Sequence, residues 1–582
     1  MCIMIELIKN IEKKIEEILE NLGVSEVKAK LVDCNRPELG QFQFNGIMAV
    51  ASKNGFKPQE LAQKLCDELQ KCDEIEQANV AGVGFVNLTL SNKHLVMQVK
   101  NTQKELEKLS QPTGNKIFID YGGPNVAKSL HVGHLRSANI GEGLKRLAKK
   151  VGNEVIADVH FGDWGRQMGM VIVGIEDRFP ELPFFDENFE GEYPKESPVS
   201  NEDLKIIYPE ANLKAKEDEE FLARCRKATY DLQNGRKGYV ELWKLFVQES
   251  MKPVLEMYDY LNVVFDLYEG ESTCNDLISP MVKDLLDRKV AYQSQGAVVI
   301  DVAKDDDKIE IPPFIVLKSD GAAMYSTTDL ATMKSRQDRF KPDEYWYVAD
   351  ARQSLHFEQL FRSVKKAGYV ADETTLTYFP FGTMNGKDGK PFKTRDGGVM
   401  TPEALVEIIQ KSINEKMQDN ENVNEEICNI ISSATVKFAD LSNNRETDFI
   451  FDVDKFCALE GKTGPYVLYT TVRAKSVLKK ATEKVEDCEI LPLENKQYVE
   501  VLLNLIKAPI AVQRAYEQKA LNVICDYVFN LSNAFNNFYS QTKILSEQDD
   551  SKRKAYLKLC DYVAKVNEEM LDILAIKVPE RM

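Results

Sequence analysis

Two periodicities of apolar residues organise the first part of the chain. Residues 1–23 place apolar side chains at helical spacing among charges of both signs and predict an amphipathic helix. Residues 58–72 predict a second helix, whereas FVNLTL at 85–90 alternates with a period of two and predicts a half-buried strand. The turn-forming run QPTGNK follows. Residues 1–110 are therefore expected to form a separate α/β domain.

The next part of the chain has the pattern of a strand, a glycine-rich turn, a helix and a second strand. KIFIDYG is a short apolar run that leads into Gly-Gly-Pro, residues 131–151 predict a helix, and NEVIADVHFG predicts the second strand. Such a unit is typical of a doubly wound parallel sheet. Four later runs, with a helix between the last two, predict the second half of the same sheet: GAVVIDV, PPFIVLKSD, EYWYVAD and LTYFPFG.

Composition changes between these two halves, and helical patterns dominate after them. Residues 182–220 are acidic and rich in Pro, Asn and Glu, which predicts a surface excursion within an insertion around 182–295. Beyond Thr401 strand signals nearly vanish. The expected fold class is α/β: a doubly wound parallel-sheet domain at 111–400, preceded by the N-terminal α/β domain and followed by an all-helical domain at 401–582.

Length and composition agree with several domains in a cytoplasmic protein. A chain of 582 residues is too long for one hydrophobic core. No window approaches the roughly twenty apolar residues that cross a bilayer, and the first helix has no signal-peptide cleavage site. None of the eleven cysteines forms a Cys-x-x-Cys pair, so a zinc ribbon or thioredoxin-type site has no support and reduced thiols are expected.

The charge of the chain argues against a protein that coats nucleic acid non-specifically. The net charge is −17, whereas such binding depends on clustered Lys and Arg. Two basic groups could still hold a nucleic acid locally, although a solvated helix face is the favoured interpretation of each. They are Arg136, Lys145, Arg146, Lys149 and Lys150, and then Arg473, Lys475, Lys479 and Lys480.

Two of only five histidines, His131 and His134, lie three residues apart around Gly133. They stand where a strand and glycine-rich turn lead into a helix, and a helix start offers unpaired N–H groups to an anion. Lys128 could add a positive charge, and Gly133 would let a flat purine approach the backbone. A nucleotide phosphate site is favoured. A structural histidine cluster stays open, and a zinc pair lacks both the usual spacing and a third ligand.

A second group of charges lies in the glycine-punctuated loop around GKPFKTR. It contains Lys387, Lys390, Lys393 and Arg395. Taken alone, this loop is most simply a solvent-exposed basic hairpin. Taken with the histidines, it would enclose a nucleotide at the carboxyl edge of the strands, where doubly wound sheets bind ligands.

These motifs carry a resemblance to a known family. HVGH resembles the HIGH signature of class I aminoacyl-tRNA synthetases, and KPFKT at 390–394 resembles their KMSKS loop. Several runs are similar to arginyl-tRNA synthetases, and the similarity covers essentially the whole chain: PNVAKSLHVGHLRS, HFGDWGRQMG, SDGAAMYSTTDLA, EGKTGPYVLYTTVRAKS and VPERM. The resemblance implies a Rossmann-like catalytic domain, an N-terminal domain that contacts the tRNA elbow and a helical anticodon-binding domain.

The resemblance also implies a reaction and its cofactors. Arginine would be activated by ATP to arginyl-adenylate and then attached to tRNA(Arg), with release of pyrophosphate and AMP. His131 and His134 would support the ATP, with Gly133 under the adenine and Lys128 nearby. Lys390 and Lys393 would stabilise the transition state. Mg²⁺ would arrive with ATP rather than in a dedicated protein site, and a monomer is the family's usual state.

Substrate-binding residues follow from the same resemblance. Asp329, in the spacing Tyr325-x-x-x-Asp329, and Asp120 would face the guanidinium of arginine, which pairs best with carboxylates. Asn125 and Gln353 would hold the α-amino and carboxylate ends of the substrate.

For tRNA, the resemblance implies contacts in both outer domains. Gln43 and Asn45 are candidates for the elbow. Tyr466, Tyr469 and Met582 are candidates for stacking on anticodon bases or for packing.

Three other functions compete with this one. A class I synthetase for another amino acid is disfavoured by the two aspartates, Asp120 and Asp329. A nucleotidylyltransferase would not need a large helical domain. A catalytically silent RNA-binding relative would be expected to lose motif histidines or lysines, and both sets are present.

Overall fold

The computed structural model describes residues 3–34, 36, 38–128, 130–319, 321, 323–390, 400–417 and 424–582. These residues fall into two compact units. The first contains Met1–Gln111, Leu459–Asp572 and Val578–Met582, and the second contains Pro112–Ala458 and Ile573–Lys577. Within the described ranges, every helix is too short or too polar to pass through a bilayer.

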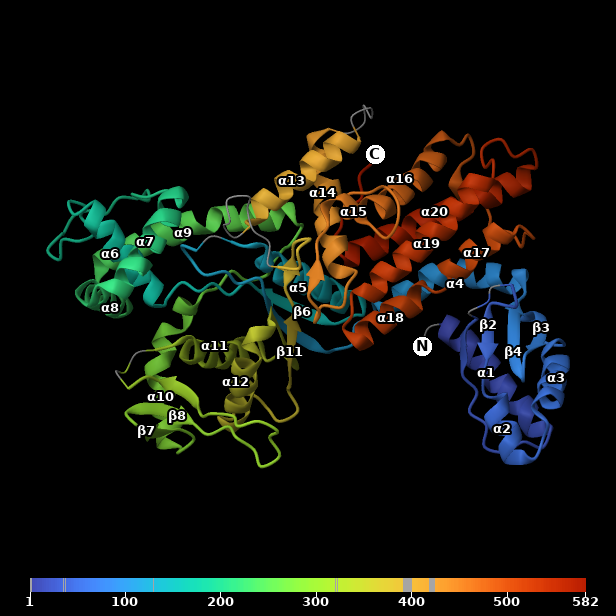
Figure 1. The fold of residues 1–582 in the computed structure, drawn as a ribbon, viewed down its shortest axis with the longest axis horizontal. Coiled ribbons are helices and arrows are strands. Elements are labelled where there is room, and N and C mark those ends of the chain that lie inside the picture. The colour runs from blue at the N-terminus through green and yellow to red at the C-terminus, as the bar shows by residue number, and fades with distance from the viewer. Residues whose placement is uncertain are drawn as a thin grey trace. The chain divides into compact units, whose positions relative to one another are not determined.

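A four-stranded parallel sheet forms the centre of the second unit (Figure 1). Its order is β11-β10-β5-β6. The strands are β5 (Lys116–Tyr121), β6 (Glu154–Asp158), β10 (Glu344–Asp350) and β11 (Thr375–Phe381). From β5 the chain passes first to β6 on one side and later to β10 on the other. The carboxyl ends of β5 and β10 therefore flank a topological switch point, where such sheets bind ligands.

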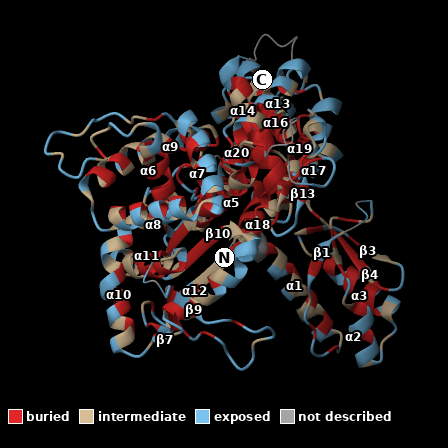
Figure 2. Ribbon diagram, turned by 60° about the vertical axis from the view of Figure 1, so that its left-hand side comes forward, coloured by how far each residue is buried: buried red, intermediate tan, exposed pale blue. Residues whose placement is uncertain are grey.

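Helices cover both faces of this sheet, which confirms the doubly wound α/β class. On one face α5 (Val132–Lys150) packs on β5, β6 and β10. It approaches closely because Gly141 has no side chain, and a Cβ there would lie 2.1 Å from the Tyr121 ring. On the other face, Phe118 and Tyr345 join a core with α11 (Tyr325–Phe340) and α12 (Ser354–Lys366). Figure 2 shows how thoroughly α5 and β10 are buried.

Two of the expected sheet strands belong elsewhere. The runs at 296–302 and 312–320 form β8 (Ala297–Ile300) and β9 (Phe314–Leu317), which pair antiparallel in a separate sheet with β7 (Tyr292–Ser294). Placing them in the parallel sheet was wrong. No helix separates them, and parallel neighbours need a long crossover, usually helical. They still share the core of α11 and α12, so their apolar pattern reflects burial alone.

The segment between β6 and β7 is mainly helical. Its elements are α6 (Arg166–Arg178), α7 (Asn201–Glu217), α8 (Glu219–Gln233), α9 (Lys237–Tyr260), the short helix η1 (Glu271–Cys274) and α10 (Asn275–Asp287). The acidic residues 182–220 are more ordered than a surface excursion. Ser200 caps α7, accepting the Asp203 N–H, and Leu204 and Ile207 are buried where α7 packs on α6.

After β11 the second unit ends in short strands and helices. These are β12 (Met384–Asn385), α13 (Pro402–Lys416), α14 (Glu425–Leu441), β13 (Phe449–Ile450) and α15 (Val453–Phe456). The short helix η2 (Ala351–Gln353) lies earlier, between β10 and α12. β12 and β13 pair in parallel. The helices α13 to α15 belong to the same compact unit as the parallel sheet. The division into domains 1–110, 111–400 and 401–582 stays a prediction.

The first unit combines both ends of the chain. Its α/β part contains α1 (Ile3–Asn21), β1 (Leu31–Asp33), β2 (Phe42–Phe44), α2 (Ile47–Asn54), α3 (Pro58–Leu69), β3 (Ile75–Ala81), β4 (Phe85–Leu90) and α4 (Asn92–Leu109). The strands form an antiparallel sheet in the order β1-β2-β4-β3, drawn in blue in Figure 1. β4 is more buried than the half-buried strand expected, because Val86, Asn87 and Leu88 are all inaccessible to solvent.

Helices dominate the C-terminal part of this unit, as expected. They are α16 (Gly464–Lys480), η3 (Val485–Asp487), α17 (Lys496–Leu505), α18 (Ala508–Gln518), α19 (Asn522–Gln541) and α20 (Asp550–Ile573). α17 and α18 pack against α4, and Lys507 Nζ lies 2.8 Å from Asp33 Oδ1. Packing against α4 joins the N-terminal and C-terminal segments into one unit.

Candidate active site

A large cleft of about 1750 Å³ opens at the carboxyl ends of β5 and β10. A typical small-molecule pocket has about 300–1,000 Å³, so this cleft has room for more than one substrate. Its walls come from the parallel strands, the start of α5, α8, α10, α11 and α12. The predicted residues that line it are Asp120, Asn125, His131, Gly133, His134, Tyr325, Asp329 and Gln353.

The two histidines form the start of α5. His131 is the N-cap, and its Nδ1 accepts the N–H of Gly133 at 3.1 Å. His134 Nδ1 in turn accepts the N–H of His131 at 3.0 Å. A ring that accepts at Nδ1 carries its proton on Nε2, so each Nε2–H remains a donor for a ligand. The motif is thus a reciprocal helix cap as well as a candidate phosphate site.

Both rings are uncharged near neutral pH. Burial and, to a smaller extent, the neighbouring His131 lower the pKa of His134 to about 4. Burial also lowers the pKa of His131. These histidines therefore act as neutral hydrogen-bond donors rather than as cations. Gly133 is required between them, because a Cβ there would lie 2.9 Å from the His131 ring.

The predicted lysines differ in what surrounds them. Lys128 Nζ lies 5.7 Å from the centroid of the Tyr208 ring, and burial lowers the pKa of this lysine. Lys390 ends a tight turn in which its backbone N–H donates to Asp388 Oδ1. Lys387 is paired with Asp454 at 2.7 Å and Asp452 at 3.1 Å. Lys393 and Arg395 lie outside the described residues.

Arg136 links the histidine helix to the segment that leads into the lysine loop. Its guanidinium is fully buried, donates from Nε to Asp440 Oδ1 at 2.9 Å and from Nη1 to the Gly382 carbonyl at 2.6 Å. It also donates to the carbonyls of Arg445 and Thr447. These contacts fix the start of α5 against the end of β11.

The basic group at 136–150 is therefore not one solvated helix face. Arg136 and Lys145 are buried, so that interpretation was wrong for both. Lys145 is instead paired with Glu142 at 2.7 Å, and Lys149 remains exposed. Charge alone did not reveal these partners, because Asp440 lies about three hundred residues away in sequence.

Arg136→Met is expected to lower the free energy of unfolding by about 3–5 kcal/mol, because it leaves the Asp440 carboxyl buried without its cation. Burial already raises the pKa of Asp440. Arg136→Met combined with Asp440→Leu should recover most of that loss. Urea unfolding of the single and double variants checks this. A single variant as stable as the parent would contradict a structural role for the pair.

Asp120 is already paired with an arginine of the chain itself. Arg336 of α11 is buried and lies 2.7 Å from Asp120 Oδ2 and 2.5 Å from Asp158 Oδ2. It also donates to the Tyr347 hydroxyl at 3.0 Å. The sheet register places Asp120 opposite both Asp158 and Tyr347, so one guanidinium joins the ends of three strands.

The ion pairs of Arg336 also affect whether a metal ion could bind beside Asp120. Asp120, Asp158 and His160 offer ligand atoms within 4.8 Å of one another. Arg336 already holds an oxygen of each aspartate. A metal ion there would compete with that guanidinium and be repelled by it. The cluster therefore fits an internal ion-pair network better than a cation site.

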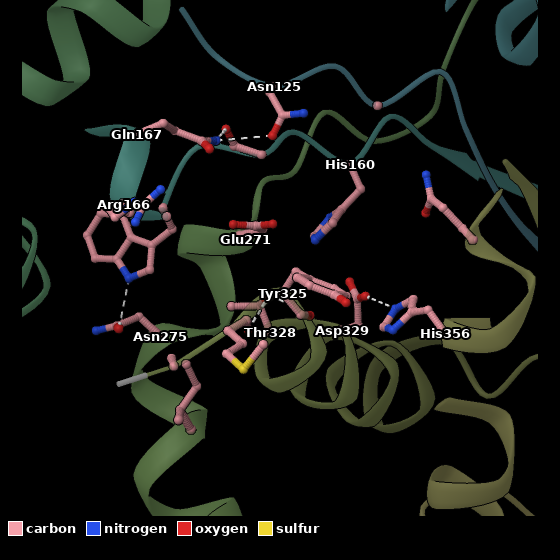
Figure 3. Close-up of a pocket in the computed structure, with 18 of the residues that line it drawn as sticks. Asn125, His160, Arg166, Gln167, Glu271, Asn275, Tyr325, Thr328, Asp329 and His356 are labelled. Carbon is pink, nitrogen blue, oxygen red and sulfur yellow. Dashed lines mark hydrogen bonds and ion pairs between the residues drawn. The ribbon is translucent and has the colours of Figure 1, made fainter. Parts of the chain in front are cut away.

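Asp329 and Tyr325 lie on one turn of α11 and face the cleft (Figure 3). Tyr325 is 57 % exposed, so it is not a core residue. The His356 Nε2 atom lies 2.6 Å from Asp329 Oδ2. Gln353 lines the cleft and also precedes α12 as its N-cap, and its contact with the substrate stays a prediction.

Glu271 is a lining residue that sequence reasoning missed. Figure 3 shows it facing the side of α11 that carries Tyr325 and Asp329. Burial and, to a smaller extent, the neighbouring Asp329 carboxylate raise the pKa of Glu271 to about 7. The residue follows no recognised motif and lies in the expected insertion, so only the fold brings it to the cleft.

Asn125 is positioned by a neighbour on another segment. Gln167 Nε2 donates to Asn125 Oδ1 at 3.1 Å and to the Gly162 carbonyl at 2.8 Å. Asn125 and Gly162 also form a parallel bridge. The loop after β5 is thereby tied to the loop after β6.

The predicted tRNA residues all lie in the first unit. Gln43 Nε2 donates to the buried Asn87 Oδ1 at 2.6 Å, and Asn45 is exposed. The Tyr466 hydroxyl donates to Asn533 at 2.7 Å, and the Tyr469 ring carries the Arg473 guanidinium 4.5 Å from its centroid. Met582 is buried, which fits packing rather than stacking.

Comparison with known families and proteins covers both units. The family model described as "tRNA synthetases class I (R), catalytic domain" matches residues 95–453. "Arginyl tRNA synthetase N terminal domain" matches 6–90 and "DALR anticodon binding domain" matches 467–582. An arginine–tRNA ligase of Agathobacter rectalis is 43% identical over 599 residues, covering 100% of both chains. One of Alkaliphilus oremlandii is 42% identical over 586 residues, covering 99% of this chain and 100% of its own.

Solved structures share the fold. The arginyl-tRNA synthetase of Plasmodium falciparum aligns with a TM-score of 0.78 at 22% identity, covering 99% of both chains. That of Thermus thermophilus aligns with a TM-score of 0.76 at 21% identity, covering 99% of this chain and 100% of its own. With the family models and the relatives, these matches confirm the resemblance indicated by the histidine and lysine motifs. The chain belongs to the arginyl-tRNA synthetase family of class I aminoacyl-tRNA synthetases.

Proposed function

We propose that the cleft joins arginine to ATP and passes the arginyl group to tRNA(Arg), as the arginine–tRNA ligases do. One observation carries the proposal: a helix start capped by two histidines and the carboxylates Asp329 and Glu271 line the same cleft. A helix start fits the phosphates of ATP. Carboxylates fit the planar guanidinium of arginine. Both substrates would thus be held with their reacting ends together.

The reaction has two group transfers. A carboxylate oxygen of arginine attacks the α-phosphorus of ATP, the bond to the β-phosphate oxygen breaks, and pyrophosphate leaves. A hydroxyl of the terminal tRNA ribose then attacks the arginyl carbonyl carbon, and AMP leaves with the bonding electron pair. Neither step needs a covalent enzyme intermediate, so positioning and charge stabilisation carry the catalysis.

His131 and His134 donate from Nε2 to the triphosphate in this proposal, because each Nδ1 is occupied by the helix cap. Gly133 leaves room for the adenine, and Lys128 adds charge beside the phosphates. Lys390 and Lys393 stabilise the negative charge that develops at the α-phosphate. Mg²⁺ would be bound with ATP and would supply positive charge to its phosphates.

Arginine binds on the other side of the cleft. Asp329 and Glu271 face its guanidinium, and the Tyr325 ring, exposed beside them, packs on its aliphatic stem. Asn125 and Gln353 hold the α-amino and carboxylate groups. Asp120 also lines the cleft, but its Oδ2 is already paired with Arg336, whose single positive charge is shared with Asp158. The guanidinium therefore pairs chiefly with Asp329 and Glu271.

The KM for arginine should fall as the pH rises through about 7. Glu271 is protonated below the pKa of about 7 and cannot then offer a full negative charge to the guanidinium. Above that pH the carboxylate binds the cation more tightly. Steady-state KM for arginine, measured between about pH 6 and pH 8, checks this. Glu271→Gln should raise KM and flatten the pH dependence; an unchanged slope in that variant would remove Glu271 from the binding step.

The first unit binds tRNA in this proposal. Gln43 and Asn45 contact the elbow. Tyr466 and Tyr469 hold anticodon bases, and Met582 packs beneath them. The enzyme works as a monomer in the cytoplasm.

The nucleotide product tests the proposed chemistry. ATP labelled at the α-phosphate should yield AMP, in a reaction that requires arginine and tRNA(Arg) together. Thin-layer separation distinguishes AMP from ADP. Formation of ADP, or of AMP without an amino acid, would overturn the adenylate route.

A further inference from the structure

We propose that His356 is a positioning residue that orients the Asp329 carboxylate for the guanidinium of arginine. The inference rests on the proposed function, in which Asp329 is the principal partner of that guanidinium. His356 does not belong to the histidine motif at the start of α5, and no motif in the sequence predicts a role for it. Figure 3 shows its ring directed at Asp329.

The contact between the two side chains is short. His356 Nε2 lies 2.6 Å from Asp329 Oδ2, the distance of a charge-assisted hydrogen bond. The two residues come from different elements, since Asp329 lies on α11 and His356 lies in the first turn of α12. An imidazole that donates from Nε2 holds one carboxylate oxygen in place and leaves the other for a ligand.

The ring of His356 is itself fixed by aromatic neighbours. Its centroid lies 4.8 Å from the Tyr325 ring in an edge-on arrangement, 5.4 Å from Phe357 and 6.4 Å from Phe314. The side chain is only 12% exposed. Packing on three sides restricts rotation of the ring, so the donor stays at one position in the cleft wall.

Orientation matters because of the shape of the substrate. A guanidinium is planar and binds a carboxylate best when both groups lie in one plane. The Asp329 side chain is 28% exposed and lines an open cleft, so without a second contact its carboxylate would rotate. His356 removes that freedom before arginine arrives. Preorganisation of this kind lowers the cost of binding.

The contact between His356 and Tyr325 positions a second side chain of the cleft. Tyr325 begins α11, is exposed to the cleft and lies against the edge of His356. One imidazole therefore positions the carboxylate through a hydrogen bond and the aromatic ring through packing. Both groups face the proposed binding site of the arginine side chain.

The test compares two replacements of the ring. His356→Leu removes the donor but keeps apolar volume, and His356→Gln can place an amide N–H near the former Nε2. His356→Leu is expected to raise KM for arginine by about tenfold to a hundredfold, as for loss of a hydrogen bond to a charged group. Its kcat at saturating arginine should change less than about threefold. His356→Gln should recover KM to within about fivefold.

Two further measurements separate positioning from general damage. Phe361→Leu on the same helix is the matched control, and its KM for arginine should stay near that of the parent. A double-mutant cycle combines His356→Leu with Asp329→Asn. If His356 acts through Asp329, its replacement should change KM less than about twofold once Asp329 has been replaced.

The outcomes are distinct. Full additivity in the cycle, or equal effects of His356→Leu and His356→Gln, would overturn the proposal while leaving Asp329 as the arginine ligand. An unchanged KM in Asp329→Asn alone would instead overturn the proposed function of Asp329. If His356→Leu does not fold by circular dichroism, His356→Asn replaces it, because its amide is too short to reach Asp329.

Discussion

Asp329→Ala is expected to lower kcat/KM for arginine by about a hundredfold to a thousandfold, because truncating one partner of a hydrogen-bonded charge pair leaves the guanidinium unpaired. The loss should appear mainly in KM for arginine, whereas KM for ATP should stay near that of the parent. Steady-state aminoacylation with each substrate varied in turn measures both constants.

The matched control for this variant lies on the same helix. Asp338→Ala removes an exposed carboxylate of α11 that pairs with Lys334 at 2.7 Å. Exposed pairs contribute little, about 0–1 kcal/mol, so stability and KM should both stay close to those of the parent. Equal losses in the two variants would mean that charge on α11, rather than a specific contact with arginine, causes the effect.

His134→Asn is expected to lower kcat by about a hundredfold to a thousandfold, because a preorganised donor to the phosphates is lost. The side-chain oxygen of asparagine can still accept the His131 N–H, which His134 Nδ1 accepts in the parent. The helix cap is therefore retained while the Nε2 donor disappears. Single-turnover transfer of arginine to tRNA, with thermal melting as the stability check, measures the effect.

His134→Ala completes this comparison. It removes both the cap and the donor, so it should lose about 1 kcal/mol of stability in addition to the same loss of rate. Full turnover in His134→Asn would contradict the catalytic role. The paired rings would then be a structural cap alone, the alternative left open by the sequence.

Local pattern was sufficient to predict the start of the site. The strand, turn and helix around HVGH follow one another in sequence, so their geometry depends on neighbours within about thirty residues. The doubly wound class follows from the same pattern. The reciprocal histidine cap was not predicted, because a pattern of residue types does not reveal which ring nitrogen is occupied.

Local sequence patterns did not predict contacts between residues that lie far apart in the sequence. Arg336 meets Asp120 and Asp158 only because three strands end side by side, and Glu271 faces Asp329 only through the fold. Tyr325 and Asp329 were identified from the family resemblance, not from their own chemistry. The sheet of β7, β8 and β9 was misplaced because apolar runs report burial and not strand partners.

Arg336 also affects the charge of the cleft wall that contains Asp120. Asp120 and Asp158 at the strand ends carry two formal negative charges, and the buried Arg336 guanidinium offsets one of them. In the proposed function, selectivity for arginine depends on Asp329 and on the protonation of Glu271. This explains why a residue outside every motif is expected to control the pH dependence of substrate binding.

Aminoacylation of total tRNA with each of the twenty amino acids, with ATP and magnesium supplied, tests the proposed function most directly. Charging by arginine alone is expected, lost in His134→Asn and weakened in Asp329→Ala at low arginine concentration. Charging by a different amino acid would contradict the assignment of Asp329 and Glu271 to a guanidinium. Binding of tRNA without any charging would contradict the proposed chemistry altogether.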